Sequence, residues 1–356
     1  MKYCLFVRED LALLKEDFFN STELNGMKSD TYMYRDLKKY LKEKGIDLNT
    51  QLINKPEDCE VVICLNETGF FVNYKRSQTN KLLTLILTEP PVYNFTDWAI
   101  ERHTYFDKVF TYDSDVVKRD PLKYVHVNFP IDLNYSIINE PISEADFNNK
   151  KLSSLVAGAI TITHSADSLR SLLFERYKII KWYNKNHPDD LDFYSRLSPL
   201  NKFEHFKGAS FINKISVKLT RSIAKILFGK NIAKVYKGAI ASLDKNKTLA
   251  SYKFNFCLEN SHGIKGLISE KIFDCFIGRT IPVYYGAPDI EHYIPKKCFI
   301  LYTDFSSLKD LHSHLLKMDY KTYIQYLESA SEFLKTSEKI FSTKTFIDKI
   351  YNVIKL

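Results

Sequence analysis

Long apolar stretches are absent from this sequence. No run approaches the ~20 consecutive apolar residues that a membrane-spanning helix needs. The opening segment, MKYCLFVREDLALL, becomes charged too soon for a signal peptide or an N-terminal anchor. We therefore expect a cytoplasmic protein.

Cysteine is scarce, and its placement argues against two kinds of site. The cysteines lie mostly inside apolar runs, without the spacing of a metal site and without a disulfide framework. The sequence therefore predicts reduced thiols in the core and a reducing compartment. The six residues are Cys4, Cys59, Cys64, Cys257, Cys275 and Cys298.

Recognisable nucleic-acid-binding modules and a G-x-G-x-x-G dinucleotide element are also missing. The chain has 356 residues and a net charge of +8, with apolar and aromatic content ample for full cores. This length predicts two domains of ordinary size. The modest positive charge favours anionic partners such as nucleotide donors or membrane lipids, and we expect no nucleic-acid partner.

The most informative stretch that is present covers residues 252–288. It begins with alternating apolar positions that predict a strand, which delivers Glu259 and Asn260 to its C-terminal end. After a polar, glycine-containing loop, Ser269 is a favourable N-cap for a helix. Residues 281–285 then read as a second buried strand. The pattern predicts a β-loop-α-β unit.

The polar residues of this unit share one rim, which is where ligands bind in open α/β sheets. The helix N-terminus at Ser269 and the Lys271 ammonium suit a diphosphate, and the Glu270 carboxylate suits sugar hydroxyls. Together they indicate a nucleotide sugar. For Glu270 and Lys271 alone, a solvated helix start is the commoner interpretation, and the whole stretch is more specific than the pair.

The stretch resembles the donor-binding signature of the α-1,3-fucosyltransferase family: YKF-x-x-x-x-EN, then Tyr-x-Thr-Glu-Lys, a helix and P-V-x-x-GAP. Nearly the whole motif is present at family spacing. The family's Tyr is Leu267 here, which leaves donor selectivity open, and its Thr is Ser269, which keeps the capping hydroxyl. The matching residues are Tyr252, Lys253, Phe254, Glu259, Asn260, Glu270, Lys271, Pro282, Gly286, Ala287 and Pro288.

This resemblance implies an α/β protein of the GT-B type, with two facing Rossmann-like domains and an active site in the cleft between them. We expect an acceptor-side domain at residues 1–150, a donor domain at 151–335 and a C-terminal helix at 336–356. The resemblance also implies inverting transfer of L-fucose from GDP-fucose to a glycan hydroxyl, O-3 in this family. It implies neither a cofactor nor a metal in the chemistry.

The resemblance also assigns roles within the donor site. Lys271 and the helix N-terminus at Ser269 would stabilise the departing diphosphate, and Glu270 would hold donor hydroxyls. Glu259 and Asn260 would line the sugar pocket.

Apolar runs in the N-terminal half predict strands near residues 2–7, 60–65, 82–88 and 108–111, and apolar positions at helical spacing predict a helix near residues 32–44. Strands that alternate with helices indicate a parallel sheet wrapped by helices.

One acidic residue of the N-terminal half stands out. Glu89 sits where a predicted buried strand ends, and Pro90 and Pro91 lock the chain behind it. From physics alone a solvent-facing loop residue is the commoner interpretation. The resembled family has an acidic residue in a similar element, read as the base that deprotonates the acceptor, and Glu89 matches it.

Two further features of the sequence require interpretation. Asp113-Ser114-Asp115 could be a DxD metal motif, but a turn and capping role is favoured. Residues 168–183 predict a helix with Arg170 in its first turn, where a cation opposes the helix dipole. An anion partner would explain Arg170, and the family places a diphosphate-binding Arg there, with Arg176 a weaker candidate.

Residues 202–237 hold nine Lys or Arg against one acidic residue. Basic positions recur at helical spacing over residues 214–227, so a basic amphipathic helix is predicted. It would either attach peripherally to the anionic inner face of the cytoplasmic membrane, near a lipid-linked acceptor, or simply cover the core.

We therefore expect a GDP-fucose-dependent glycosyltransferase that acts on a glycan acceptor of surface polysaccharide or lipopolysaccharide. One alternative is the same fold with another nucleotide-sugar donor. Another is a carbohydrate-binding homologue without catalysis, which the intact set of acidic and basic residues argues against. A membrane-docking scaffold would leave the donor signature unexplained.

Overall fold

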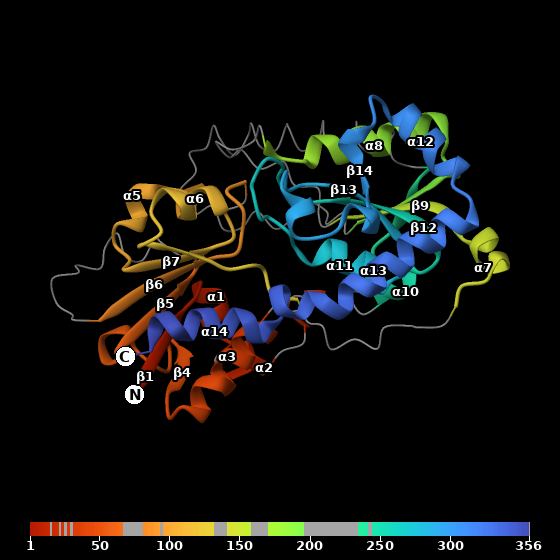
Figure 1. Cartoon of the computed structure of the whole chain (residues 1–356). Coiled ribbons are helices and arrows are strands. Elements are labelled where there is room, and N and C mark those ends of the chain that lie inside the picture. The colour runs from red at the N-terminus through yellow and green to blue at the C-terminus, as the bar shows by residue number, and fades with distance from the viewer. Residues whose placement is uncertain are drawn as a thin grey trace.

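The computed structural model describes residues 1–14, 16–20, 23–24, 27–28, 31–66, 81–92, 95–131, 141–157, 170–195, 234–240 and 244–355. The predicted basic helix at 214–227 therefore lies outside the described residues. Figure 1 shows two α/β halves side by side, with both chain termini in the N-terminal half. Among the described residues, no helix is long and apolar enough to cross a membrane.

The first half is built on a six-stranded sheet in which every pairing is parallel. The predicted strands near residues 2–7, 60–65, 82–88 and 108–111 are all present. Two others escaped prediction because they are short and partly polar. The order across the sheet is β4 (Asp47–Thr50), β1 (Lys2–Phe6), β5 (Val61–Leu65), β6 (Leu82–Leu87), β7 (Lys108–Thr111) and β8 (Tyr124–His126).

Helices and a small hairpin surround this sheet. The predicted helix near residues 32–44 is α3, and it buries Tyr34, Leu37 and Leu41, which recur at helical spacing. The elements are α1 (Glu9–Ala12), α2 (Glu16–Asn20), β2 (Glu23–Leu24), β3 (Met27–Lys28), α3 (Tyr32–Glu43), η1 (Pro56–Asp58), η3 (Phe95–Trp98), α5 (Ile100–His103) and α6 (Ser114–Arg119).

A second six-stranded parallel sheet forms the other half. Its chain order reverses between β9 and β12, which is the topological switch point where open α/β sheets bind ligands. In order across the sheet, the strands are β11 (Tyr236–Gly238), β10 (Leu191–Ser195), β9 (Lys151–Ala157), β12 (Tyr252–Leu258), β13 (Ile281–Tyr285) and β14 (Ile300–Leu301).

The helices of the second half include one that starts later than predicted. We expected a helix over 168–183, but α8 spans Leu173–Asn186, and its N-cap residue, Leu172, offers no capping side chain. Phe147 of α7 packs in the core of the second sheet, ahead of the boundary expected at residue 150. The remaining elements are α7 (Glu144–Asn149), α10 (Lys245–Leu249), α11 (Glu270–Ile277), η6 (Ile290–His292), η7 (Lys296–Cys298), η8 (Tyr302–Asp304), α12 (Leu308–Lys317) and α13 (Tyr320–Phe341).

The last helix, α14 (Thr343–Ile354), returns to the first half (Figure 1). The backbone N–H of Ile131 donates to the Phe341 carbonyl at 2.7 Å where α13 ends. Phe346 and Ile350 of α14 are buried in the core of the first sheet, and the Tyr3 hydroxyl donates to the Ile354 carbonyl. The C-terminal segment therefore ties the two halves together.

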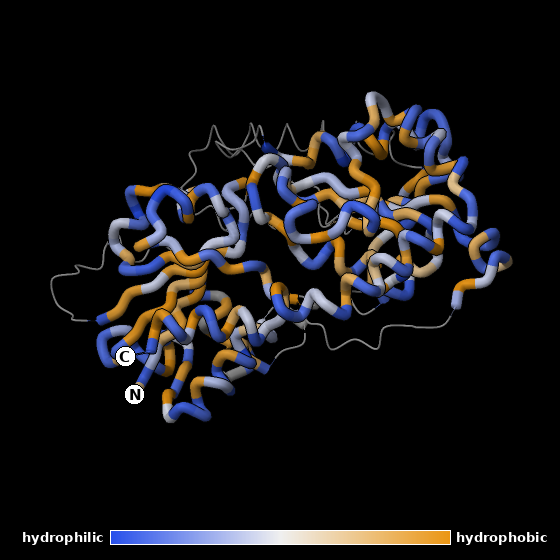
Figure 2. The backbone as a smooth tube through the Cα atoms, viewed as in Figure 1, coloured by the Kyte–Doolittle hydropathy of each residue, from blue (hydrophilic) through white to orange (hydrophobic). Residues whose placement is uncertain are grey.

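Hydrophobic residues concentrate along the strands of both halves, as Figure 2 shows. All six cysteines are buried and free, which confirms the prediction of core thiols without disulfides.

Candidate active site

The donor motif places its polar residues at the carboxyl end of β12, beside the switch point. Glu259 and Asn260 directly follow this strand. Arg176 of α8 is buried next to this strand end. One of its guanidinium nitrogens donates to the carbonyls of Leu258 and Glu259, both at 2.8 Å. It also donates to Asn260 Oδ1 at 3.2 Å. Arg176 thus holds the strand end in place, and this position does not suit a direct diphosphate contact.

Glu259 is buried against the start of α11. It is 1% exposed, and both of its oxygens accept hydrogen bonds from the start of α11. The Ser269 backbone N–H donates to Oε1 at 2.9 Å, and the Ser269 hydroxyl donates to Oε2 at 2.7 Å. Lys271 Nζ lies 3.1 Å from the same Oε2. The resemblance assigned Glu259 to the sugar pocket, whereas the structure shows it anchoring Ser269 and Lys271.

Ser269 is the N-cap of α11, as predicted, and its hydroxyl accepts from the Lys271 backbone N–H. The same hydroxyl accepts from Lys271 Nζ at 2.8 Å. An ammonium has three N–H donors, and Glu259 and Ser269 occupy two of them. Lys271 is therefore held in place at the helix start, where we had expected a mobile charge, with one donor left for another acceptor.

Glu270 lies beside Lys271, with Oε1 at 3.8 Å from Lys271 Nζ. Burial favours the neutral forms of Glu270 and Lys271, but the charged side chains around them have a larger, opposite effect on both pKa values. The carboxylates of Glu259 and Glu270 raise the pKa of Lys271. The cations of Lys271 and Lys245 lower the pKa of Glu270. Both groups are therefore charged at neutral pH.

Glu89 comes from the first half, two residues beyond the end of β6. Its backbone is fixed by Asn66, whose Oδ1 accepts from the N–H groups of Thr88 at 2.8 Å and Glu89 at 3.1 Å. The Asn66 amide also donates to the Thr88 hydroxyl at 2.6 Å. On the other side, the Trp98 indole N–H donates to the Glu89 carbonyl at 2.8 Å. The strand end is therefore held from two directions.

The Glu89 side chain is accessible to solvent, but protein from both halves surrounds it. Loss of solvation raises the pKa of Glu89, the Lys271 charge opposes this rise, and the Glu270 carboxylate adds to it. Glu89 therefore lies within electrostatic reach of the donor cluster. A carboxylate of the first half and the charged helix start of the second half thus act on one another electrostatically.

Residues 265–267 make a further contact between the halves. Lys265 pairs with Asp115 at 2.8 Å. Gly266 has a φ of +74°, and a Cβ atom there would lie 2.3 Å from the Tyr112 carbonyl oxygen. Leu267 is buried in a small cluster with Tyr112 and Ile264. The residue that departs from the family motif thus fills an apolar contact between the halves.

Arg170 lies outside the helix in which it was predicted. It precedes α8, and its carbonyl accepts from the His262 backbone N–H at 2.9 Å, next to the strand end at Asn260. Its charge also acts on Asp113: burial raises the pKa of that carboxyl, and Arg170 opposes the rise. Arg170 is exposed at the rim of the donor cluster, so it remains a candidate for an anionic ligand although the helix-dipole argument for it was wrong.

Asp113 has the predicted capping role. Its carboxylate accepts from the backbone N–H groups of Asp115 at 2.9 Å and Val116 at 3.3 Å at the start of α6. Asp115 is engaged by Lys265. The two carboxylates therefore have structural roles of their own.

Comparisons with known proteins agree with this geometry. Over its full length, the chain superimposes on a crystal structure of an α1,3-fucosyltransferase with a TM-score of 0.51 and 14% identity, covering 90% of that chain. An α-glucosyltransferase in complex with UDP-glucose and DNA superimposes with a TM-score of 0.57 and 12% identity, and each chain is covered completely. At these identities the likeness concerns the fold, and it confirms the predicted GT-B architecture.

The fold is therefore that of a GT-B glycosyltransferase. Residues 204–351 match the family model described as "Glycosyltransferase family 10 (fucosyltransferase) C-term". This match agrees with the resemblance found in the sequence.

Curated relatives match over a shorter stretch. The chain is 35% identical over 100 residues to the alpha-(1,3)-fucosyltransferase FucT of Helicobacter pylori, covering 25% of this chain and 21% of that protein. It is 36% identical over 83 residues to the GDP-fucose protein O-fucosyltransferase 3 of Xenopus tropicalis, covering 22% of this chain and 17% of that protein. The matched stretch thus spans about a fifth of the length of these relatives.

Asn66 was missed in the sequence, and it has a testable role as a positioning residue. We expect Asn66→Ala to lower kcat by about tenfold or more and to leave the KM for the donor nearly unchanged, because the Glu89 backbone loses its clamp. Asn66 also has a φ of +45°, which Asn tolerates better than Ala. Asn66→Gly therefore serves as the control that removes the clamp without backbone strain. Steady-state kinetics of both variants would test the role, and a Gly variant with wild-type kcat would contradict it.

Proposed function

We propose that this protein transfers L-fucose from GDP-fucose to a hydroxyl group of a glycan acceptor. The observation that carries the proposal is the meeting of Glu89 with the Lys271–Glu270 pair at the switch point of the second sheet. The donor motif that supplies Lys271 and Glu270 lies within the segment matching the fucosyltransferase family.

In the proposed reaction, Glu89 accepts the proton of the acceptor hydroxyl. At the same time, the oxygen of that hydroxyl bonds to the anomeric carbon of fucose. The bond from that carbon to the diphosphate breaks, and GDP leaves. Lys271 and the positive end of the α11 dipole stabilise the charge that develops on the diphosphate. Arg170 adds a second cation at the rim, Glu270 binds donor hydroxyls and Asn260 borders the sugar. Neither a metal nor another cofactor takes part in this scheme.

We further propose that the transfer inverts the anomeric configuration, because a single carboxylate acting as base is all that one displacement needs. From GDP-β-L-fucose the product would then be an α-L-fucoside. Proton NMR of the freshly formed product measures this directly. A β-fucoside would contradict both the inversion and the assigned role of Glu89.

For the acceptor we propose O-3 of a hexose in a surface polysaccharide or lipopolysaccharide precursor. A similar protein from mouse is named 4-galactosyl-N-acetylglucosaminide 3-alpha-L-fucosyltransferase 9, and it is 34% identical over 96 residues. The basic segment at 214–227 would bring the enzyme to a lipid-linked acceptor at the membrane face. A screen of galactosyl-N-acetylglucosamine, free and lipid-linked, tests the acceptor class.

A thermal-shift panel tests the donor first. We expect GDP and GDP-fucose to raise the Tm by mass action, and UDP, CMP and GDP-mannose to have much smaller effects. A selective response to UDP or GDP-mannose would keep the fold and overturn the fucose assignment. A nucleotide-sugar donor other than GDP-fucose is a real alternative, because Leu267 replaces the family's Tyr. If no nucleotide shifts the Tm, the non-catalytic homologue is favoured instead.

A further inference from the structure

Three side chains gather away from the donor cluster, at the opposite edge of the second sheet. His187 ends α8, Asp190 precedes β10, and His312 belongs to α12. The donor site lies at the carboxyl ends of the parallel strands, whereas Asp190 lies at the amino end of its strand. The cluster therefore has no part in the proposed transfer.

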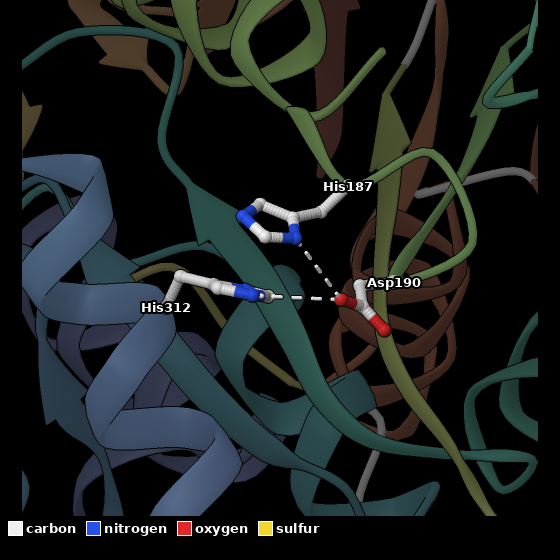
Figure 3. A group of neighbouring side chains, drawn as sticks. All are labelled: His187, Asp190 and His312. Atoms are coloured by element: carbon white, nitrogen blue, oxygen red, sulfur yellow. Dashed lines mark ion pairs between the residues drawn. The ribbon is translucent and has the colours of Figure 1, made fainter. Parts of the chain in front are cut away.

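The three side chains point toward one another, as Figure 3 shows. Asp190 Oδ2 lies 3.4 Å from His312 Nε2 and 3.8 Å from His187 Nδ1. The two imidazole rings stack with their centroids 4.1 Å apart. One ligand atom from each residue falls within 4.8 Å of the other two.

His312 carries a buried nitrogen that lacks a hydrogen bond and has the Asp190 carboxylate as its polar neighbour. It is 3% exposed, and its Nε2 is buried with no hydrogen bond among the described residues. A buried nitrogen left in this way costs free energy, so native structures generally satisfy such atoms. Its other nitrogen, Nδ1, lies 3.3 Å from the Tyr183 hydroxyl. With the ring proton on Nδ1, Nε2 directs a lone pair toward Asp190.

We propose that His187 Nδ1, Asp190 Oδ2 and His312 Nε2 bind a divalent transition-metal ion of the zinc class. Tetrahedral ligands of zinc lie about 3.3 Å from one another, which is close to the 3.4 Å and 3.8 Å separations of the Asp190 oxygen from the two histidine nitrogens. The two stacked imidazoles, with ring centroids 4.1 Å apart, would have to turn so that both nitrogens face the ion. Two imidazoles and one carboxylate favour zinc, copper or nickel over magnesium and calcium, which prefer oxygen ligands. A water molecule on the partly exposed His187 side would complete the shell.

The surroundings of the cluster suit a structural metal site. Metal-binding histidines usually donate their second N–H to a fixed acceptor, and the buried Tyr183 hydroxyl is placed for this. The Asp190 carbonyl accepts from the Ser153 hydroxyl, which fixes the turn before β10. A bound metal would fasten α12 to the α8–β10 turn. Its effect should therefore appear in stability and leave donor affinity unchanged.

The competing explanation is a stacked histidine pair with an ordinary His–Asp contact. It predicts no specific metal affinity. The two explanations are separated by experiments on the full chain, purified without a polyhistidine tag and stripped with a chelator.

We expect elemental analysis of the protein purified without chelator to find about one zinc per chain. Zinc added to the stripped protein should raise the Tm by about 5 °C at saturating concentration, and magnesium and calcium should not. Cobalt(II) should give visible absorption bands with the intensity of a four-coordinate site. Absence of metal in the purified protein together with no zinc-dependent shift would overturn the proposal.

Variants test whether these three residues bind the metal. His187→Gln is mild because His187 is partly exposed, and it should weaken zinc binding at least tenfold and remove the cobalt bands. His312→Phe keeps the ring volume and should have the same effect. His314→Gln is the matched control, because His314 is an exposed residue of the same helix. Equal zinc affinity in His187→Gln and His314→Gln would show that the metal binds elsewhere.

Discussion

Glu89→Gln is expected to abolish fucosyl transfer, to preserve donor binding and to raise the Tm at neutral pH. The variant keeps the size of the side chain and removes the proton acceptor, so turnover should fall by about 10²- to 10⁴-fold. Donor binding depends on the second half of the molecule and should persist. GDP release would measure turnover, and calorimetric titration with GDP-fucose would measure donor binding.

The stability effect follows from the direction of the pKa shift. The folded-state pKa of Glu89 is raised, chiefly because the carboxylate loses solvation on folding. The stability that its protonated form contributes is present below the unfolded-state pKa and is lost as pH rises through the folded-state pKa. At neutral pH the ionised carboxylate therefore destabilises the fold, and removing its charge should stabilise the protein. The gain in Tm should disappear below about pH 4.

The same shift predicts the acid limb of activity. As a base, Glu89 must be ionised, so wild-type kcat/KM should fall with decreasing pH through a pKa above the ordinary Glu value. Glu101→Gln is the matched control, since Glu101 is exposed on α5. If Glu89→Gln turned over at a rate near wild type, another group would have to accept the proton.

Local patterns made much of the fold predictable. Residues that are close in the sequence determine the strand β12, the Ser269 cap and the apolar face of α11. Alternation, capping and helical spacing therefore identified these elements. The strand β4, with the sequence DLNT, was missed because its four residues become a strand only by pairing with β1. The start of α8 was misplaced because Leu172 gives no capping signal.

The positions of the candidate residues along the chain were easier to predict than the contacts that these residues make. Sequence placed Glu89, Glu270 and Lys271 at strand and helix ends, and the topology brings those ends together. The sequence does not show whether a carboxylate that follows a strand is buried. The hydrogen bond from Lys271 to the buried Glu259 carboxylate was therefore not predicted. The clamp on Glu89 by Asn66 depends on two strands lying side by side, which no local pattern encodes.

Lys271→Ala is expected to weaken both the fold and the donor complex, and the two effects can be separated. The substitution leaves Glu259 as a buried carboxylate without its cation, and breaking such a pair costs about 3 kcal/mol. It also removes the ammonium proposed to bind the diphosphate, which should reduce affinity for GDP-fucose by about 10- to 100-fold. Chemical denaturation and calorimetric titration measure the two losses.

The double variant Lys271→Ala/Glu259→Gln separates these effects. Neutralising Glu259 removes the unpaired buried charge while the amide oxygen can still accept from Ser269, so much of the lost stability should return. Donor affinity should remain low, because the diphosphate still lacks its cation. Lys297→Ala is the surface control, since that side chain is 64% exposed and should change neither property. If the double variant recovered donor binding together with stability, Lys271 would act only by holding Glu259, and the diphosphate would have to be stabilised by Arg170 and the helix start at Ser269.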